Sequence, residues 1–290
     1  MTDLGRTSRS RRLPVPHVGG RAYGSVERRG SPLNEIDFEQ ANVAMVSRTV
    51  VQPPPWIEGI PTDHRGFPVP AEAGWGEENR PLIALVDSMR KVGLLTVRAC
   101  AVCGFRMAEG RPVYRAFSQA DAAQIRGYER EFSHDLAGPL HKSCTLYSVL
   151  VCPYLRQRNA RLGKASTIQP GARRGTLAAV MGFQDMCLMV YARSHQFMAP
   201  NEPPPYAGYL GLVEDIKYHD GIELKDAYVS AVAEDAEHID MTDERHYWMH
   251  DDLDGLERLL WAQTKAITDG QPINRIEIQG IGEYVGFRLP

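Results

Sequence analysis

Four residues between positions 100 and 144 have the types and the spacing of a metal-binding site. Cys100 and Cys103 are separated by two residues, and Gly104 follows them. His141 and Cys144 form a second pair with the same spacing. Zinc is bound tetrahedrally by thiolates in such a tight turn, together with ligands that share one face of a helix. We therefore expect a zinc ion held by these two pairs.

A site of this composition would be structural. Three thiolates and one imidazole fill a tetrahedral coordination sphere, so no position remains for a water molecule whose pKa the metal could lower to about 7. Its binding energy, of order 10 kcal/mol or more, would instead contribute to folding of the surrounding chain.

Other roles for these residue types remain open. A Cys-x-x-Cys pair could be redox-active, but a thioredoxin-like motif has its first cysteine at the start of a helix and needs no later His-x-x-Cys. His134 is the alternative to His141 as fourth ligand. Cys152 lies about 12 Å beyond Cys144 along a continuous helix, too far to share its ion. We expect Cys152 and Cys187 to pack as small apolar residues.

A second pair of histidines lies in an acidic stretch. His246 and His250 have the spacing that places two imidazoles on one face of a helix, which makes them a possible second metal site. No Glu directly follows His246, so the zinc-protease pattern is excluded. A solvated helix start is the other interpretation of this stretch.

The elements expected around the first site have the order of a treble-clef zinc fold. Cys100–Gly104 predicts a tight zinc knuckle, and Phe105–Phe117 predicts a hairpin after it. Pro139 favours a helix start, so His141 and Cys144 are expected in the opening turns of a helix. We predict the α+β class, with a treble-clef-like zinc domain followed by a small mixed α/β region.

Hydrophobic spacing predicts the elements on either side. Leu82–Val92 has the spacing of a helix, and Leu94–Arg98 that of a short strand leading into the cysteines. The predicted later strands are Met186–Ala192, Tyr209–Tyr218, Arg275–Gln279 and Tyr284–Leu289, and the predicted later helices are Asp226–Ala233 and Leu253–Ile267.

These elements divide the chain into four parts. Residues 1–40 are rich in arginine and poor in apolar residues, and should form a flexible basic arm that is either a passive tail or a contact for phosphates. Residues 41–93 hold a strand, a Pro/Gly-rich strap and a helix. Residues 94–156 are the zinc domain. Residues 157–290 form an α+β region with an acidic segment at 201–257.

Two further motifs accompany the metal-ligand candidates. Residues 60–70 read Ile-Pro-Thr-Asp-His-Arg-Gly-Phe-Pro-Val-Pro, and Cys152 is followed by Pro-Tyr-Leu. With the pattern C-x2-C … H-x2-C-x7-C-P, they resemble an uncharacterised zinc-binding protein family of actinobacteria and their phages. The resemblance covers residues 60–232 and departs from the family near Gln119–Asp135. It implies a zinc site, and since the family has no established activity it implies nothing about catalysis.

The charges are strongly segregated along the chain. Residues 136–184 contain no Asp or Glu, whereas residues 201–257 contain sixteen, within a net charge of −3. A basic region beside a zinc-bearing helix is typical of contact with nucleic acid, and an acidic protein surface would also fit it. Alternatively, it packs on the chain's own acidic half. The basic residues concerned are Lys142, Arg156, Arg158, Arg161, Lys164, Arg173 and Arg174.

Composition narrows the class of protein. Hydrophobic residues make up 43% and charged residues 24%, as in globular proteins. No apolar run approaches the roughly 18 residues of a membrane helix, and we expect neither a membrane partner nor an export signal. The five cysteines are clustered rather than spread as a disulfide framework, so we expect a cytoplasmic protein.

The sequence favours a non-enzymatic, zinc-stabilised binding protein whose basic zinc region contacts nucleic acid or an acidic protein surface. One alternative is a metal-dependent hydrolase or nuclease that uses His246 and His250. Another is a phage-related structural or regulatory interaction protein. The sequence predicts no oligomeric state.

Overall fold

The computed structural model describes residues 51–64, 66–152, 155, 178–193, 202–216, 218, 221–249, 252–268 and 270–289. All of them belong to one compact unit, Ala44–Pro290. The predicted basic arm at 1–40, nearly all of the strand predicted at Val43–Val51, and the basic connection predicted after the zinc domain, whose six Lys and Arg residues lie between positions 156 and 174, fall outside the described residues.

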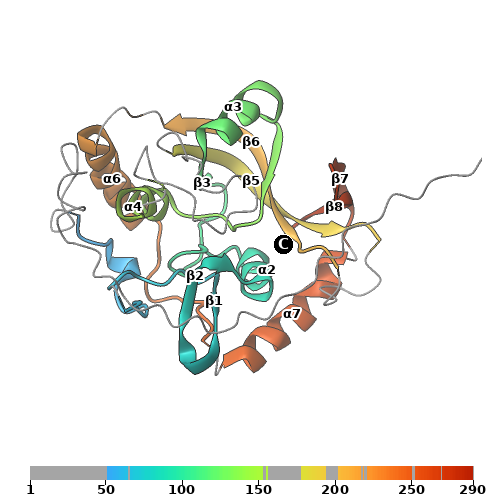
Figure 1. The fold of residues 1–290 in the computed structure, drawn as a ribbon, viewed down its shortest axis with the longest axis horizontal. Coiled ribbons are helices and arrows are strands. Elements are labelled where there is room, and N and C mark those ends of the chain that lie inside the picture. The colour runs from blue at the N-terminus through green and yellow to red at the C-terminus, as the bar shows by residue number, and fades with distance from the viewer. Residues whose placement is uncertain are drawn as a thin grey trace, which may run out of the picture. The chain divides into compact units, whose positions relative to one another are not determined.

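An antiparallel sheet of six strands organises the described chain (Figure 1). Its strands have the order β4-β6-β5-β8-β7, and β3 pairs with β5 off this path. The long strand β5 pairs with β3 through its first five residues and with β8 through its last five. The strands are β3 (Val113–Phe117), β4 (Phe132–Asp135), β5 (Ala179–Tyr191), β6 (Tyr206–Ile216), β7 (Pro272–Ile278) and β8 (Gly282–Arg288).

Helices pack around this sheet, and a separate hairpin precedes it. Figure 1 shows α4 beside α6 and α2 beside α7, and these pairs are in contact. The α-helices are α2 (Ser88–Thr96), α3 (Gln119–Tyr128), α4 (Lys142–Val151), α6 (Gly221–Ala236) and α7 (Leu253–Thr268). The hairpin is β1 (Ala73–Trp75) with β2 (Pro81–Val86), and the short 3-10 helices are η2 (Pro55–Ile57) and η3 (Glu77–Asn79).

The chain is therefore α+β, as predicted. The later predicted elements are largely confirmed: Met186–Ala192 falls in β5 except for its last residue, and Asp226–Ala233 lies inside α6. Strands from both sides of the predicted boundary at residue 156 pair in one sheet, since β3 and β4 hydrogen-bond to β5 and β6. No helix in the described part of the chain is both long and apolar enough to cross a membrane.

The helix predicted at Leu82–Val92 is wrong, because the chain there forms β2 and then α2. Leu82 and Leu85 have helical spacing, but they are 39% and 53% exposed on the hairpin. The helix begins after Asp87, whose side chain accepts a hydrogen bond from the backbone N–H of Arg90 at 2.9 Å. This N-cap fixes the helix start six residues later than hydrophobic spacing suggested.

The strand predicted at Leu94–Arg98 is also wrong, because its first three residues belong to α2. Helix α2 continues through Thr96, and Leu94 and Leu95 are both fully buried. Arg98 then has a positive φ of 53°, which turns the chain toward the cysteines.

The hairpin predicted at Phe105–Phe117 is wrong as well. Between Ala99 and Pro112 the described chain has one isolated bridge, Ala99 to Arg106, and no strand. The strand that follows, β3, takes β5 as its partner, with Val113 opposite Phe183 and Phe117 opposite Ala179. Local spacing could not reveal a partner more than sixty residues away.

Candidate metal centre

The first two donors come from a tight turn between α2 and β3. The backbone N–H of Cys100 donates to the carbonyl of Phe105 at 2.9 Å, and that of Gly104 donates to the carbonyl of Cys100 at 2.9 Å. Gly104 has φ +75°, and a Cβ at this position would lie 2.5 Å from the carbonyl oxygen of His246. The turn thus needs glycine, both for its conformation and for a close backbone contact.

The other two donors are placed by the start of α4. Leu140 exchanges two backbone hydrogen bonds of 2.9 Å with Tyr114 on β3, which anchors the chain just before the helix. His141 is the N-cap residue of α4, and its carbonyl accepts from the N–H of Thr145 at 3.0 Å. Cys144 lies in the first turn, so the two side chains project in the same direction.

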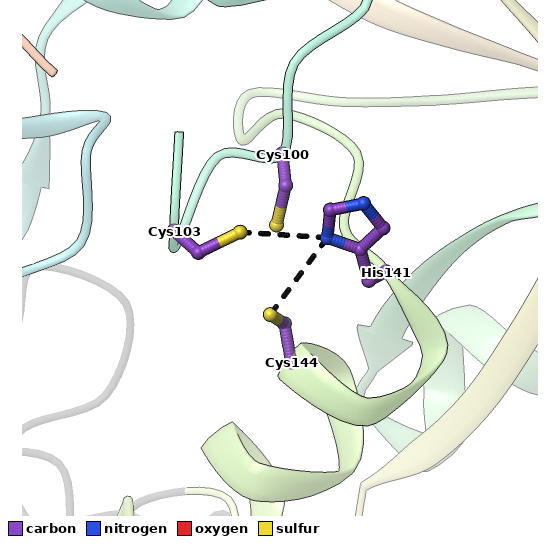
Figure 2. A group of neighbouring side chains, drawn as sticks. All are labelled: Cys100, Cys103, His141 and Cys144. Atoms are coloured by element: carbon purple, nitrogen blue, oxygen red, sulfur yellow. Dashed lines mark hydrogen bonds between the residues drawn. The ribbon is translucent and has the colours of Figure 1, made fainter. Parts of the chain in front are cut away.

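The four side chains converge on one point (Figure 2). Their donor atoms all lie within 4.8 Å of one another, and the residues are buried. Nδ1 of His141 is 3.4 Å from Sγ of Cys103 and 3.9 Å from Sγ of Cys144. Tetrahedral coordination with bonds of about 2.3 Å to sulfur and 2.0 Å to nitrogen places these atoms about 3.5 Å apart. The cluster can therefore hold a metal ion.

The tautomer of His141 also suits a metal ligand. Its Nε2 lies 3.1 Å from the carbonyl oxygen of Arg106, which can only accept a hydrogen bond, so Nε2 carries the proton. Nδ1 faces the three sulfur atoms and is the nitrogen that would donate its lone pair to a metal bound among them. A backbone carbonyl that orients a histidine in this way is a usual partner of a metal-ligating imidazole.

The electrostatics of the cluster favour a bound cation. Burial opposes ionisation of Cys100, but hydrogen bonds with Cys103 and Cys144 and the charge of His141 bring its pKa well below the usual value. Burial also opposes the charge on His141, yet Cys103 and Cys100 raise its pKa well above the usual value. Burial and then the neighbouring cysteines raise the pKa of the Cys103 and Cys144 thiols, and a cation at the centre would oppose this effect.

The rival assignments do not join this cluster. Cys152 is the C-cap residue of α4, and Cys187 lies buried on β5, where burial raises the pKa of its thiol to about 12. His134 lies on β4 with its ring edge-on to Tyr206 at 5.4 Å. Cys100 follows the end of α2 and does not begin a helix, unlike the first cysteine of a thioredoxin-like motif.

The predicted second metal site does not form a helix face. Residues 244–249 have no regular secondary structure, and α7 begins only at Leu253. His246 is buried, and its backbone N–H donates to the carbonyl of Gly104 at 2.9 Å. Burial lowers the pKa of its imidazole. Over the described ranges, the Cys100 cluster is the only group found that could hold a metal, and His250 falls outside them.

Lys142 is paired within the chain. Its Nζ lies 2.9 Å from a carboxylate oxygen of Glu214 on β6 and 3.4 Å from one of Glu234 on α6. It also lies 5.6 Å from the ring centroid of Tyr114. For this residue, packing on the chain's own acidic half is confirmed. The other predicted basic residues, Arg156, Arg158, Arg161, Lys164, Arg173 and Arg174, lie outside the described ranges.

The sequence did not predict which acidic residues contact the elements around the metal centre. Asp235 accepts a hydrogen bond from the backbone N–H of Ser143 at 2.8 Å, in the first turn of α4. Glu234 pairs with Arg111, and Asp243 lies 3.7 Å from Arg106. The excess of acidic residues at 201–257 was the only signal for such contacts, and it indicated neither which residues would meet nor that Arg106 and Arg111, outside the basic stretch at 136–184, would take part.

Comparison with known proteins adds nothing to this geometry. Searches of protein-family models, curated proteins and solved structures find no match to the chain. The resemblance to an actinobacterial and phage family therefore stays a prediction, and conclusions about function rest on the site itself.

Proposed function

We propose that this chain is a zinc-stabilised binding protein in which the metal holds the fold together and takes no part in chemistry. The observation that carries the proposal is the closure of the donor set: four donors converge and are all buried. Cys100, Cys103 and Cys144 have no exposed surface, and His141 is 7% exposed. Zinc with three thiolates and one imidazole would have no open position for substrate or water.

Zinc is the metal that best fits this set. Thiolate ligands favour zinc over magnesium, calcium or manganese, which prefer oxygen donors. A knuckle followed by a helix that carries the second pair of donors is also the ligand arrangement of a treble clef. We propose that relationship for the knuckle and α4 alone, because β3 does not form a hairpin before the helix.

We further propose that the binding surface is the basic connection at residues 156–174. This stretch carries six Lys or Arg residues and no Asp or Glu, so it suits an anionic partner such as nucleic acid or an acidic protein surface. Lys142 would contribute little to binding, since two glutamates already neutralise it.

The test combines metal analysis with binding by the full chain. We expect one zinc per chain by elemental analysis. We also expect binding of DNA or RNA that weakens steeply as salt rises, because each neutralised phosphate contributes a slope of about −0.9 for duplex DNA or −0.7 for single strands. A triple charge reversal of Arg156, Arg158 and Arg161 to Glu should abolish it.

Lys142→Gln is the matched control for the charge reversal. It removes one positive charge near the same region, but from an ion pair within the protein, so binding should be unchanged while the stability falls. No binding at low salt would exclude nucleic acid as the partner. A chain purified without metal that retains its full thermal stability would exclude the structural role of zinc.

A further inference from the structure

A cavity of about 470 Å³ opens between α3 and the sheet, and no metal ligand lines it. Its volume is within the range of about 300–1,000 Å³ that is typical of small-molecule sites. Its apolar lining includes Phe117, Ile125 and Leu155. Its polar and charged lining residues are Arg115, Ser118, Asp121, Gln124, Glu129, His134, Asp135 and Tyr206.

An ion pair between two distant strands lies in the wall of this cavity. Nε of Arg115 on β3 donates to a carboxylate oxygen of Asp135 on β4 at 2.8 Å. Strands β5 and β6 lie between these two strands, which would place them about 14 Å apart in a flat sheet. The contact therefore requires the sheet to curl, and α3 crosses from one curled edge to the other.

The guanidinium of Arg115 retains hydrogen-bonding capacity toward the cavity. Only its Nε has an acceptor within the described part of the chain, which leaves the two terminal nitrogens able to bind an acceptor from outside. Burial disfavours its charge, but the carboxylate of Asp135 raises the pKa of Arg115 above its ordinary value. The group is therefore a permanent cation, suited to bidentate binding of a carboxylate.

The rest of the charged lining has the opposite sign. Asp121 is in the first turn of α3 and Glu129 is its C-cap residue, and both residues line the cavity. Their carboxylates also accept hydrogen bonds from Ser118 Oγ and Gln124 Nε2, respectively. Together with Asp135, the cavity lining contains three carboxylates and one guanidinium. A purely anionic ligand would be repelled by this lining, whereas a ligand with one anionic group and an excess of cationic groups would match it.

We propose that this cavity binds a basic amino acid. Its carboxylate would bind the terminal nitrogens of Arg115, and its cationic groups would lie against Asp121 and Glu129. Its methylene chain would pack on Phe117 and Ile125. The site is separate from the metal centre and does not depend on the function proposed for it.

The probes that test this are L-arginine, agmatine and L-citrulline, titrated calorimetrically into the full-length, metal-loaded protein. Agmatine lacks the carboxylate, and citrulline replaces the guanidinium with a neutral group of nearly the same shape. We expect L-arginine to bind and each analogue to bind at least about tenfold more weakly, since each loses a charged hydrogen-bonding group. No heat from any probe at millimolar concentration would overturn the proposal, as would equal affinity for arginine and citrulline.

Substitutions on α3 provide the second readout without disturbing the buried ion pair. Glu129→Gln combined with Asp121→Asn should weaken arginine binding about tenfold and citrulline binding less, because citrulline has only its α-ammonium group to lose a carboxylate partner. Glu131→Gln is the matched control, because this exposed residue lies two positions from Glu129 and does not line the cavity. Unaltered arginine affinity in a folded double variant would contradict the proposed site.

Discussion

Asp235 on α6 accepts a hydrogen bond of 2.8 Å from the backbone N–H of Ser143, in the turn of α4 that carries Cys144. The first N–H groups of a helix have no partner within it, and a carboxylate there also interacts favourably with the helix dipole. A residue from the acidic segment thus caps the helix that carries Cys144, one of the four candidate metal ligands.

Asp235→Ala should therefore lower the free energy of unfolding by about 1–3 kcal/mol, because it leaves a buried N–H unsatisfied. The measurement is urea denaturation of the metal-loaded protein. Asp226→Ala is the control, since Asp226 is exposed on the same helix, and it should change stability by less than about 0.5 kcal/mol. Equal effects of the two substitutions would mean that the contact with Ser143 contributes nothing to stability.

Gly104→Ala should destabilise the protein more than Gly110→Ala. Both glycines have positive φ, +75° and +73°, so alanine meets similar backbone strain at each. Only at Gly104 would the new Cβ lie 2.5 Å from the carbonyl oxygen of His246, whereas nothing lies within 4 Å at Gly110. We expect a difference of at least about 1 kcal/mol in thermal or urea denaturation. Identical stabilities would show that the segment around His246 moves away freely.

Replacing single cysteines should separate metal ligands from packing residues. Cys144→Ser should lower the zinc content of the purified chain from one equivalent toward zero, because the hydroxyl is a poor replacement for a thiolate. Cys187→Ser, which alters an equally buried thiol on β5, should leave zinc content unchanged. His141→Cys should retain the metal. Retention of one full equivalent by Cys144→Ser would remove Cys144 from the ligand set.

Glu72 should make stability depend on pH. Burial raises the pKa of this carboxyl to about 7, although Arg115 and the backbone N–H of Gly138 act in the opposite direction. The folded protein therefore holds this proton more tightly than the unfolded chain, and stability is lost as pH rises from about 4.5 to about 7. The loss should be about 3 kcal/mol relative to Glu72→Gln, which carries no titrating group.

This difference is measured by urea denaturation of both proteins between pH 4.5 and 8. Burial lowers the pKa of Lys91 to about 8. Deprotonation of Lys91 therefore increases stability only above about pH 8, outside the pH range of the measurement. Parallel pH profiles of stability for wild type and Glu72→Gln would show that burial of Glu72 does not disfavour its ionised form.

The clustering of the four candidate donors could be predicted because their spacing is local. Two residues between Cys100 and Cys103, and two between His141 and Cys144, are enough to define each pair. The surroundings of these pairs could not be predicted in the same way. The contact of Gly104 with His246 joins positions that are far apart in sequence and carry no shared pattern.

The errors before the cysteines have a different origin. Hydrophobic spacing placed the helix over Leu82 and Leu85, which face outward on a hairpin, while the cap at Asp87 decided where the helix begins. The sequence left open whether Lys142 contacts an external partner or the chain's own acidic half, because its two partners, Glu214 and Glu234, depend on how β6 and α6 meet α4.

The pairing of β3 with β5 bears on whether the metal-binding part is a module. A fragment of residues 94–156 would keep all four donors, yet it would lack the strand that β3 pairs with. It would also lack Asp235, which caps α4, and His246, which covers the knuckle. Unlike a zinc finger that can be moved between proteins as a cassette, this centre is inseparable from the later half of its own chain.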